Sequence, residues 1–79
     1  MPYSITVDLH GHTRESARDL LNFTMKNLPK DVREVEVIHG YRQGTALRDL
    51  VRNYQNARIE RKILSMNQGS TLFLIRRSS

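Results

Sequence analysis

The chain has 79 residues, the size of one small domain, and it contains no cysteine. The lack of cysteine excludes a disulfide scaffold, a thiolate zinc site, an iron–sulfur cluster and a cysteine nucleophile. No apolar run approaches the roughly 20 residues that span a membrane, and the first residues show no secretory signal. We therefore predict one soluble, cytoplasmic domain over residues 1–79, with its core at about 4–77 and no membrane partner.

The charge is concentrated in one half of the chain. The net charge is +5, of which residues 1–40 contribute −1 and residues 41–79 contribute +6. Seven of the eight cations in the second half are arginines, whose planar fork suits phosphate. A polyanion such as nucleic acid is the partner that this asymmetry favours. The alternative is a solvated surface that only keeps the protein in solution.

The first elements in chain order are a strand over residues 4–9 and a helix from about 14 to 27. Alternating apolar residues define one face of the strand: Ile5, Val7 and Leu9. Gly11 breaks this pattern, and His12 or Thr13 can cap the helix. Its apolar stripe recurs at helical spacing: Ala17, Leu20, Leu21, Thr24, Met25 and Leu28. Pro29 ends the helical pattern.

A second strand is predicted over residues 32–39, where the run Val37-Ile38 suggests burial on both faces, as in a parallel strand. Thr45 is the expected N-cap of a second helix. The apolar positions of that helix are Leu47, Leu50, Val51 and Tyr54.

The last two strands are expected over residues 59–66 and 71–76, with a turn at 67–70. On strict alternation, one face of the third strand carries Ile59, Arg61 and Ile63. Met25, Tyr54, Leu64, Met66 and Phe73 are assigned to the core. A four-residue connection requires an antiparallel hairpin. The order β-α-β-α-β-β, with parallel strand–helix–strand crossovers, predicts an α/β sandwich of two or three layers on a mixed sheet.

Polar residues follow the first strand at the point where it ends. Asp8 and His10 lie two apart, so we expect them on one face, with the carboxylate orienting the imidazole for proton transfer. This expectation places Asp8 among apolar neighbours, where it needs a partner. The alternative is structural: Asp8 accepts backbone hydrogen bonds from the turn and His10 covers the sheet edge.

The second strand ends in the same way, in His39-Gly40. If the two strands are neighbours, His39 joins Asp8 and His10 as a candidate second proton carrier or phosphate ligand. Gly11, Gly40 and Gly44 then let backbone N–H groups approach a phosphate, with Thr45 opening a helix whose dipole favours it. Glycine at such turns is also common for steric reasons alone.

The spacing His10-x-His12 beside Asp8 makes a divalent metal conceivable, but the turn at Gly11 is expected to splay the two rings. We predict no metal ligand and no cofactor.

Arginines flank the second loop and continue along the second helix. Arg42, Arg48 and Arg52 are the candidate phosphate ligands, and Tyr41 either stacks on a base or packs on the sheet. Further cations extend this candidate surface: Arg58, Arg61, Lys62, Arg76 and Arg77. The alternative is a charged exterior in which Asp19 or Asp49 neutralises Arg48.

Two segments together resemble the Smr (small MutS-related) domain. The first is Asp8-Leu9-His10-Gly11, followed by an amphipathic helix. The second carries His39, Gly40, Gly44, Thr45, Leu47 and Arg48. The resemblance covers residues 5–76. The second motif departs from the family's His-Gly-x-Gly-x-Gly, because the middle glycine is missing and the loop is one residue longer.

The resemblance implies the fold of the C-terminal domain of translation initiation factor three, an α+β two-layer sandwich. It also implies binding of structured nucleic acid and, in several members, endonuclease activity on DNA or RNA, with links to ribosomes or DNA repair. The leading hypothesis is thus an endonuclease, a phosphodiester hydrolase acting on RNA or branched DNA through Asp8, His10 and His39. The altered loop keeps a second hypothesis open, a binding module that docks on nucleic acid, a ribosome or a repair complex without cleaving. A third is a protein-interaction domain that uses its sheet edge.

Overall fold

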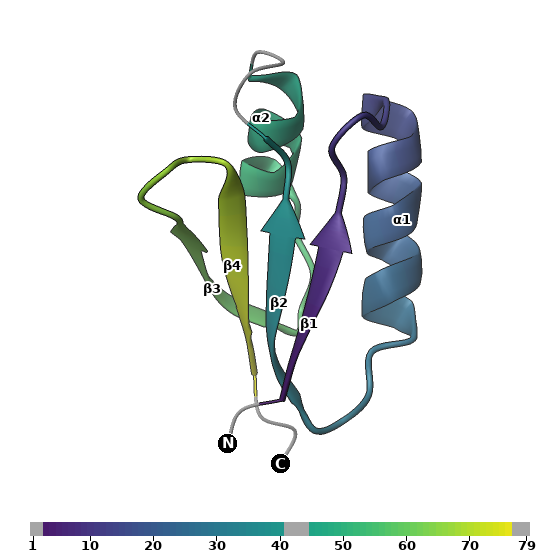
Figure 1. Ribbon diagram of the computed structural model, residues 1–79. Helices are drawn as coiled ribbons and strands as arrows, with labels where there is room; N and C mark the ends of the chain where they lie inside the picture. Colours follow the sequence, from purple (N-terminus) through teal and green to yellow (C-terminus); the bar gives the residue numbers. More distant parts are fainter. Residues whose placement is uncertain (1–2, 41–44, 77–79) are drawn as a thin grey trace.

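The structure is a computed structural model that describes residues 3–40 and 45–76 (Figure 1). Its elements in chain order are β1 (Tyr3–Asp8), α1 (Arg14–Lys26), β2 (Val32–Ile38), α2 (Ala46–Asn53), β3 (Ile59–Leu64) and β4 (Ser70–Ile75). The sheet order is β1-β2-β4-β3. β1 and β2 are parallel, whereas β4 is antiparallel to both of its neighbours. The predicted element order, the parallel first pair and the closing hairpin are all confirmed.

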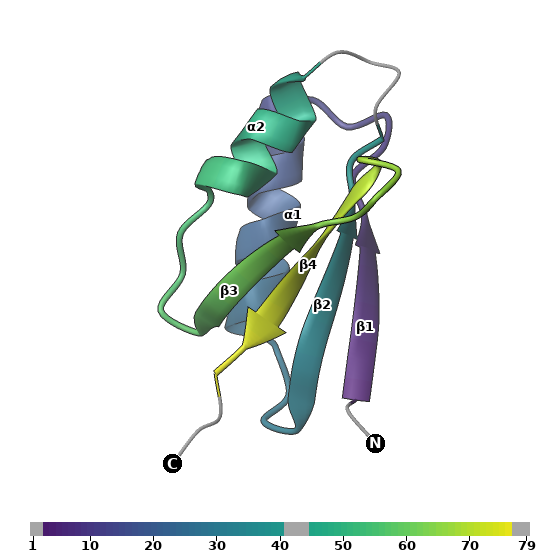
Figure 2. The ribbon, with the colours of Figure 1, turned by 90° about the vertical axis from the view of Figure 1, so that its left-hand side faces the viewer.

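Both helices cover the same face of the sheet, so the two-layer alternative is the correct one (Figure 2). One buried cluster joins the inner residues of α1 and α2 to alternate residues of the strands. Those strand residues include Val7, Val35, Val37, Phe73 and Ile75. We call this side of the sheet the covered face and the opposite side the open face.

The expectation that β2 is buried on both faces is wrong in part. Val37 is fully buried on the covered face, but Ile38 points to the open face and is only half-buried. No helix covers that side, and so the parallel pair is protected from one direction only.

Phe73 lies in the core, on β4, one of the two inner strands of the sheet. It is fully buried, and its ring stacks on Tyr54 with centroids 6.2 Å apart and planes 5° from parallel. Tyr54 follows α2 directly, and its hydroxyl donates to Asn22 Oδ1 of α1 at 2.8 Å. This contact ties both helices to the sheet, and burial raises the pKa of Tyr54.

The two helix starts differ in how they are capped. Thr13 caps α1 through a reciprocal pair of bonds with Ser16, as one of the two predicted caps. Thr45 is the N-cap residue of α2, but its side chain makes no capping hydrogen bond. Within residues 3–40 and 45–76, neither helix is long and apolar enough to cross a membrane.

A β-bulge in β3 breaks the predicted alternation. The pairing with β4 shifts between Ile59 and Arg61, so Ile59 turns to the covered face and packs on the core. From there Lys62 and Leu64 share the covered face, while Arg61 and Ile63 face out. Two residues assigned to the core are exposed instead: Leu64 is 47% exposed although it lies on the covered face, and Met66 is fully exposed beyond the strand end.

Candidate nucleic-acid interface

The site predicted from the sequence lies at one edge of the sheet, which we call the carboxyl edge. β1 and β2 end there, α1 and α2 begin there, and the turn between β3 and β4 closes its third side (Figure 1). Asp8 is in register with Ile38, and the Leu9 N–H donates to the Ile38 carbonyl at 2.7 Å. The two loops are therefore neighbours, as expected from parallel strands.

Asp8 and His10 meet at this edge in an exposed position. His10 Nδ1 is 3.9 Å from Asp8 Oδ1, and the two side chains are 67% and 58% exposed. The same carboxylate oxygen accepts the His10 backbone N–H at 2.9 Å. The expectation of an Asp8 buried among apolar neighbours is wrong, because the strand alternation turns it to the open face. Asp8 holds the turn, as the structural alternative had it, and also faces the imidazole.

His39 lies on the other side of the sheet, inside the protein. It is 1% exposed. Its Nε2 is 3.0 Å from Thr71 Oγ1, and its Nδ1 is 3.0 Å from the Gly40 carbonyl oxygen. A carbonyl only accepts, so Nδ1 carries the proton and Nε2 of a neutral ring accepts from the Thr71 hydroxyl. Within the described residues, no hydrogen bond or ion pair joins His39 to Asp8 or His10.

The two glycines that follow these histidine loops adopt left-handed backbone conformations. Gly11 has φ +84° and Gly40 has φ +75°, values that residues with a Cβ adopt at a cost. The Gly40 N–H donates to the Gly69 carbonyl at 2.9 Å, and the His39 N–H donates to the same oxygen at 3.0 Å. The β3–β4 turn is thereby fastened to the end of β2, and the Gly40 N–H is already occupied.

His12 contacts the first turn of α1. Its Nδ1 lies 3.1 Å from Ser16 Oγ, next to the Thr13 cap. In the part of the chain that the structure describes, no three His, Asp or Glu side chains are close enough together to hold a metal ion.

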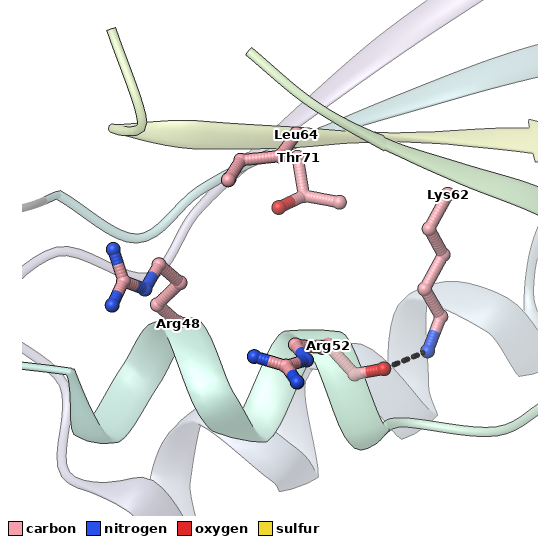
Figure 3. A pocket seen from close by; sticks show the side chains of 5 residues that line it. All are labelled: Arg48, Arg52, Lys62, Leu64 and Thr71. Atoms are coloured by element: carbon pink, nitrogen blue, oxygen red, sulfur yellow. Dashed lines mark hydrogen bonds between the residues drawn. The ribbon is translucent and has the colours of Figure 1, made fainter. Parts of the chain in front are cut away.

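Arg48 and Arg52 project from α2 toward β3 and β4. With Lys62, Leu64 and Thr71 they line a hollow of about 250 Å³, the α2–β4 hollow (Figure 3). Arg48 Nη1 donates to Gln68 Oε1 of the β3–β4 turn at 3.1 Å. Among the described residues, no carboxylate lies within ion-pair distance of Arg48, so neither Asp19 nor Asp49 neutralises it.

Several cations of the second half stabilise the fold through backbone carbonyls. Lys62 Nζ donates to the Arg52 carbonyl at 2.8 Å and to the Tyr54 carbonyl, at the end of α2. Burial lowers the pKa of Lys62, whereas these two acceptors stabilise its charged form. Arg58 donates to the Leu28 carbonyl, and Arg76 to that of Ala57. Fewer cations of this half are therefore available to bind phosphate than the sequence analysis predicted.

Tyr41, Arg42, Gly44 and Arg77 lie outside the described residues. Sequence reasoning did not single out Thr71 or Leu64 as site residues. Both residues face α2 because Leu64 pairs with Thr71 in the β3–β4 hairpin, a register that neither residue shows on its own.

Comparisons with known proteins agree with this geometry. The model of the Smr domain family matches residues 7–71. Among solved structures, the Smr domain of Thermus thermophilus MutS2 superposes with a TM-score of 0.78 at 22% identity. The match covers 90% of this chain and 96% of that one. A search of curated proteins finds no match. The family match spans both histidine loops and most of the described elements, and the chain belongs to the Smr domain family.

Proposed function

We propose that this domain binds nucleic acid at the carboxyl edge and cleaves phosphodiester bonds, in RNA or in structured or branched DNA. The observation that carries the proposal is the exposed Asp8–His10 pair at the end of β1, on the carboxyl edge where both helices begin. An imidazole that faces a carboxylate is a suitable proton carrier near neutral pH. The membership in a family associated with nucleic-acid binding and endonucleases supports it.

His10 is the proposed general acid or base. Asp8 faces its Nδ1, which leaves Nε2 to take a proton from the attacking oxygen or to give one to the leaving oxygen. Arg48 and Arg52 are proposed to hold the phosphate backbone beside the reacting bond. Gly11, Tyr41, Arg42, Gly44 and Thr45 remain candidates for further phosphate contacts, whereas the N–H of Gly40 already donates to the Gly69 carbonyl.

His39 is proposed as a positioning residue. Its two ring nitrogens are engaged by Thr71 and Gly40, and its ring is buried, so it reaches no substrate in this arrangement. Its proposed role is to fix Gly40 and Thr71 relative to each other.

The second candidate function is a non-catalytic module that binds nucleic acid or a ribosome. The burial of His39 favours it specifically, because a two-histidine mechanism loses its second proton carrier. In that case Arg48 and Arg52 matter more than His10.

Cleavage assays separate the two candidates. Labelled single-stranded RNA, hairpin RNA and branched DNA are incubated with the parent and with His10→Ala, each with and without EDTA. General acid–base catalysis contributes about 10²–10⁴-fold, so His10→Ala should lose turnover by at least the lower factor while binding persists.

The matched control is His12→Ala, which removes an exposed imidazole two residues away. It should cleave at the parent rate. Equal loss in both variants would assign the effect to the loop as a whole. A His10→Ala protein that cleaves as fast as the parent refutes the assignment, and salt-sensitive binding without any cleavage supports the non-catalytic module.

A further inference from the structure

The α2–β4 hollow has walls that suit a flat ring better than an ion. Its volume is about 250 Å³, and an enclosed cavity of about 150 Å³ already holds a benzene ring. Leu64 and Thr71 line the strand side of the hollow, the stems of Arg48 and Arg52 line the opposite side on α2, and the stem of Lys62 reaches across from β3 at one end (Figure 3).

The Thr71 hydroxyl offers a hydrogen-bond acceptor to this hollow. Its proton is directed to His39 Nε2, because the Gly40 carbonyl fixes the proton of the neutral ring on Nδ1. The lone pairs left on Thr71 Oγ1 attract an N–H group. They repel a phosphate oxygen, which also carries only lone pairs.

The charges at the hollow sit at its rim. Lys62 Nζ is engaged by the carbonyls of Arg52 and Tyr54 at one end. Arg48 is held by the neutral Gln68, and within the described residues no hydrogen bond engages the guanidinium of Arg52. None of the described lining residues is acidic. Both guanidinium groups thus keep donors for phosphates that flank an inserted group.

We propose that the α2–β4 hollow binds one unpaired nucleobase, whose N–H edge donates to Thr71 Oγ1 while Arg48 and Arg52 contact the adjoining phosphates. The size of the hollow and the acceptor in its wall suit a base, and the positive charge beside it suits the phosphates on either side. Together they favour a nucleotide that is part of a strand. A paired base keeps its edge and both faces inside the duplex, so the occupant must be single-stranded or extruded. This inference rests on the proposed nucleic-acid binding and adds to it the class of substrate.

The test compares a short single strand with a strand of the same length that lacks its bases but keeps every phosphate. Affinities are measured by fluorescence anisotropy at mildly alkaline pH, where histidine is neutral. The parent should prefer the base-bearing strand by about tenfold. The same strand annealed to its complement should lose this preference.

Two adjacent residues of β3 supply the matched variants. Leu64 is 47% exposed and lines the hollow, whereas Ile63 is 43% exposed and lies on the open face. Leu64→Ala should reduce the preference for the base-bearing strand several-fold, and Ile63→Ala should leave it unchanged. Thr71→Val should act like Leu64→Ala, with Thr71→Ser as its hydroxyl-bearing control. Leu64→Ala decides the question if Thr71→Val does not fold.

Equal affinity of the parent for both strands overturns the base site, but salt-sensitive binding to both would leave the proposed nucleic-acid binding intact. An Ile63→Ala variant that loses the preference while Leu64→Ala keeps it also overturns the site. Failure to bind any strand would overturn the proposed function itself, and the base site with it.

Discussion

At the residue scale, the buried His39 links two parts of the molecule that the sequence keeps 32 positions apart. Its ring joins the end of β2 to Thr71 of β4, and its backbone N–H shares the Gly69 carbonyl with Gly40. Every polar atom of the ring has a partner, as burial requires. A histidine in this setting stabilises the carboxyl edge.

We expect His39→Ala to lower the free energy of unfolding by about 2–4 kcal/mol. The substitution opens a cavity and leaves the Thr71 hydroxyl and the Gly40 carbonyl without their partner. His10→Ala, at an exposed position, should change the same quantity by less than about 0.5 kcal/mol. Chemical denaturation followed by circular dichroism measures both. Equal stabilities of the two variants would contradict the assigned role of His39.

The prediction correctly placed His39 at the same end of the sheet as Asp8 and His10, but it placed His39 on the wrong face. Adjacent parallel strands that end in histidine predict proximity, and Leu9 does pair with Ile38. The face of each side chain depends on the register between the strands. Asp8 pairs with Ile38, so both point to the open face, and His39, one residue later, points to the opposite face. The alternation within each strand agrees with this outcome, because Val7 and Val37 are both buried and so place Asp8 and His39 on opposite faces, but the prediction relied on the shared strand end alone.

At the element scale, the two N-caps provide a comparison within one chain. Thr13 and Thr45 both precede a helix, as predicted, but only the Thr13 side chain bonds to the helix backbone. Thr45 adopts a helical backbone conformation with φ −106° and ψ −1°, whereas a side-chain cap needs the extended form seen at Thr13.

Thr13→Ala should therefore cost about 1 kcal/mol of unfolding free energy, and Thr45→Ala only a few tenths. Thermal melts of both variants, analysed at one temperature, give the comparison. A Thr45→Ala cost as large as that of Thr13→Ala would show that the hydroxyl of Thr45 caps α2 after all.

The strands show where periodicity stops being informative. Ile5, Val7 and Leu9 alternate as a half-buried strand should, and the structure agrees. In β3 the same rule failed, because one extra residue at the bulge reverses the faces of everything before it. Leu64 and Met66 were misassigned for different reasons: Leu64 lies on the covered face but lines the hollow beside α2, and Met66 lies beyond the end of the strand.

At the scale of the whole molecule, the uneven charge has two uses. Some of the cations stabilise the fold: Lys62, Arg58 and Arg76 donate hydrogen bonds to backbone carbonyls. Arg48 and Arg52 remain on α2 beside the hollow, and Arg48 also contacts Gln68 of the β3–β4 turn. The net charge alone predicted a polyanionic partner but not which cations would meet it.

The salt dependence of binding counts these contacts. If three or four phosphates are held, log K should fall with log salt at a slope of about −3 on duplex DNA. Arg48→Gln and Arg52→Gln should each make the slope shallower by about 0.9. The exposed Arg61 on the open face is the control, and Arg61→Gln should leave the slope unchanged. A common slope for all three variants would contradict a localised binding surface.

The position of β4 in the sheet has a consequence for folding during synthesis. It is the last described strand along the chain, yet it lies between β2 and β3 in the sheet. Until residues 70–75 have left the ribosome, the growing chain offers two unsatisfied strand edges and lacks the Phe73 ring in its core. Such edges invite pairing with other chains. β4 is the strand that removes this hazard, so the sheet cannot close and the hollow cannot form before residues 70–75 are available.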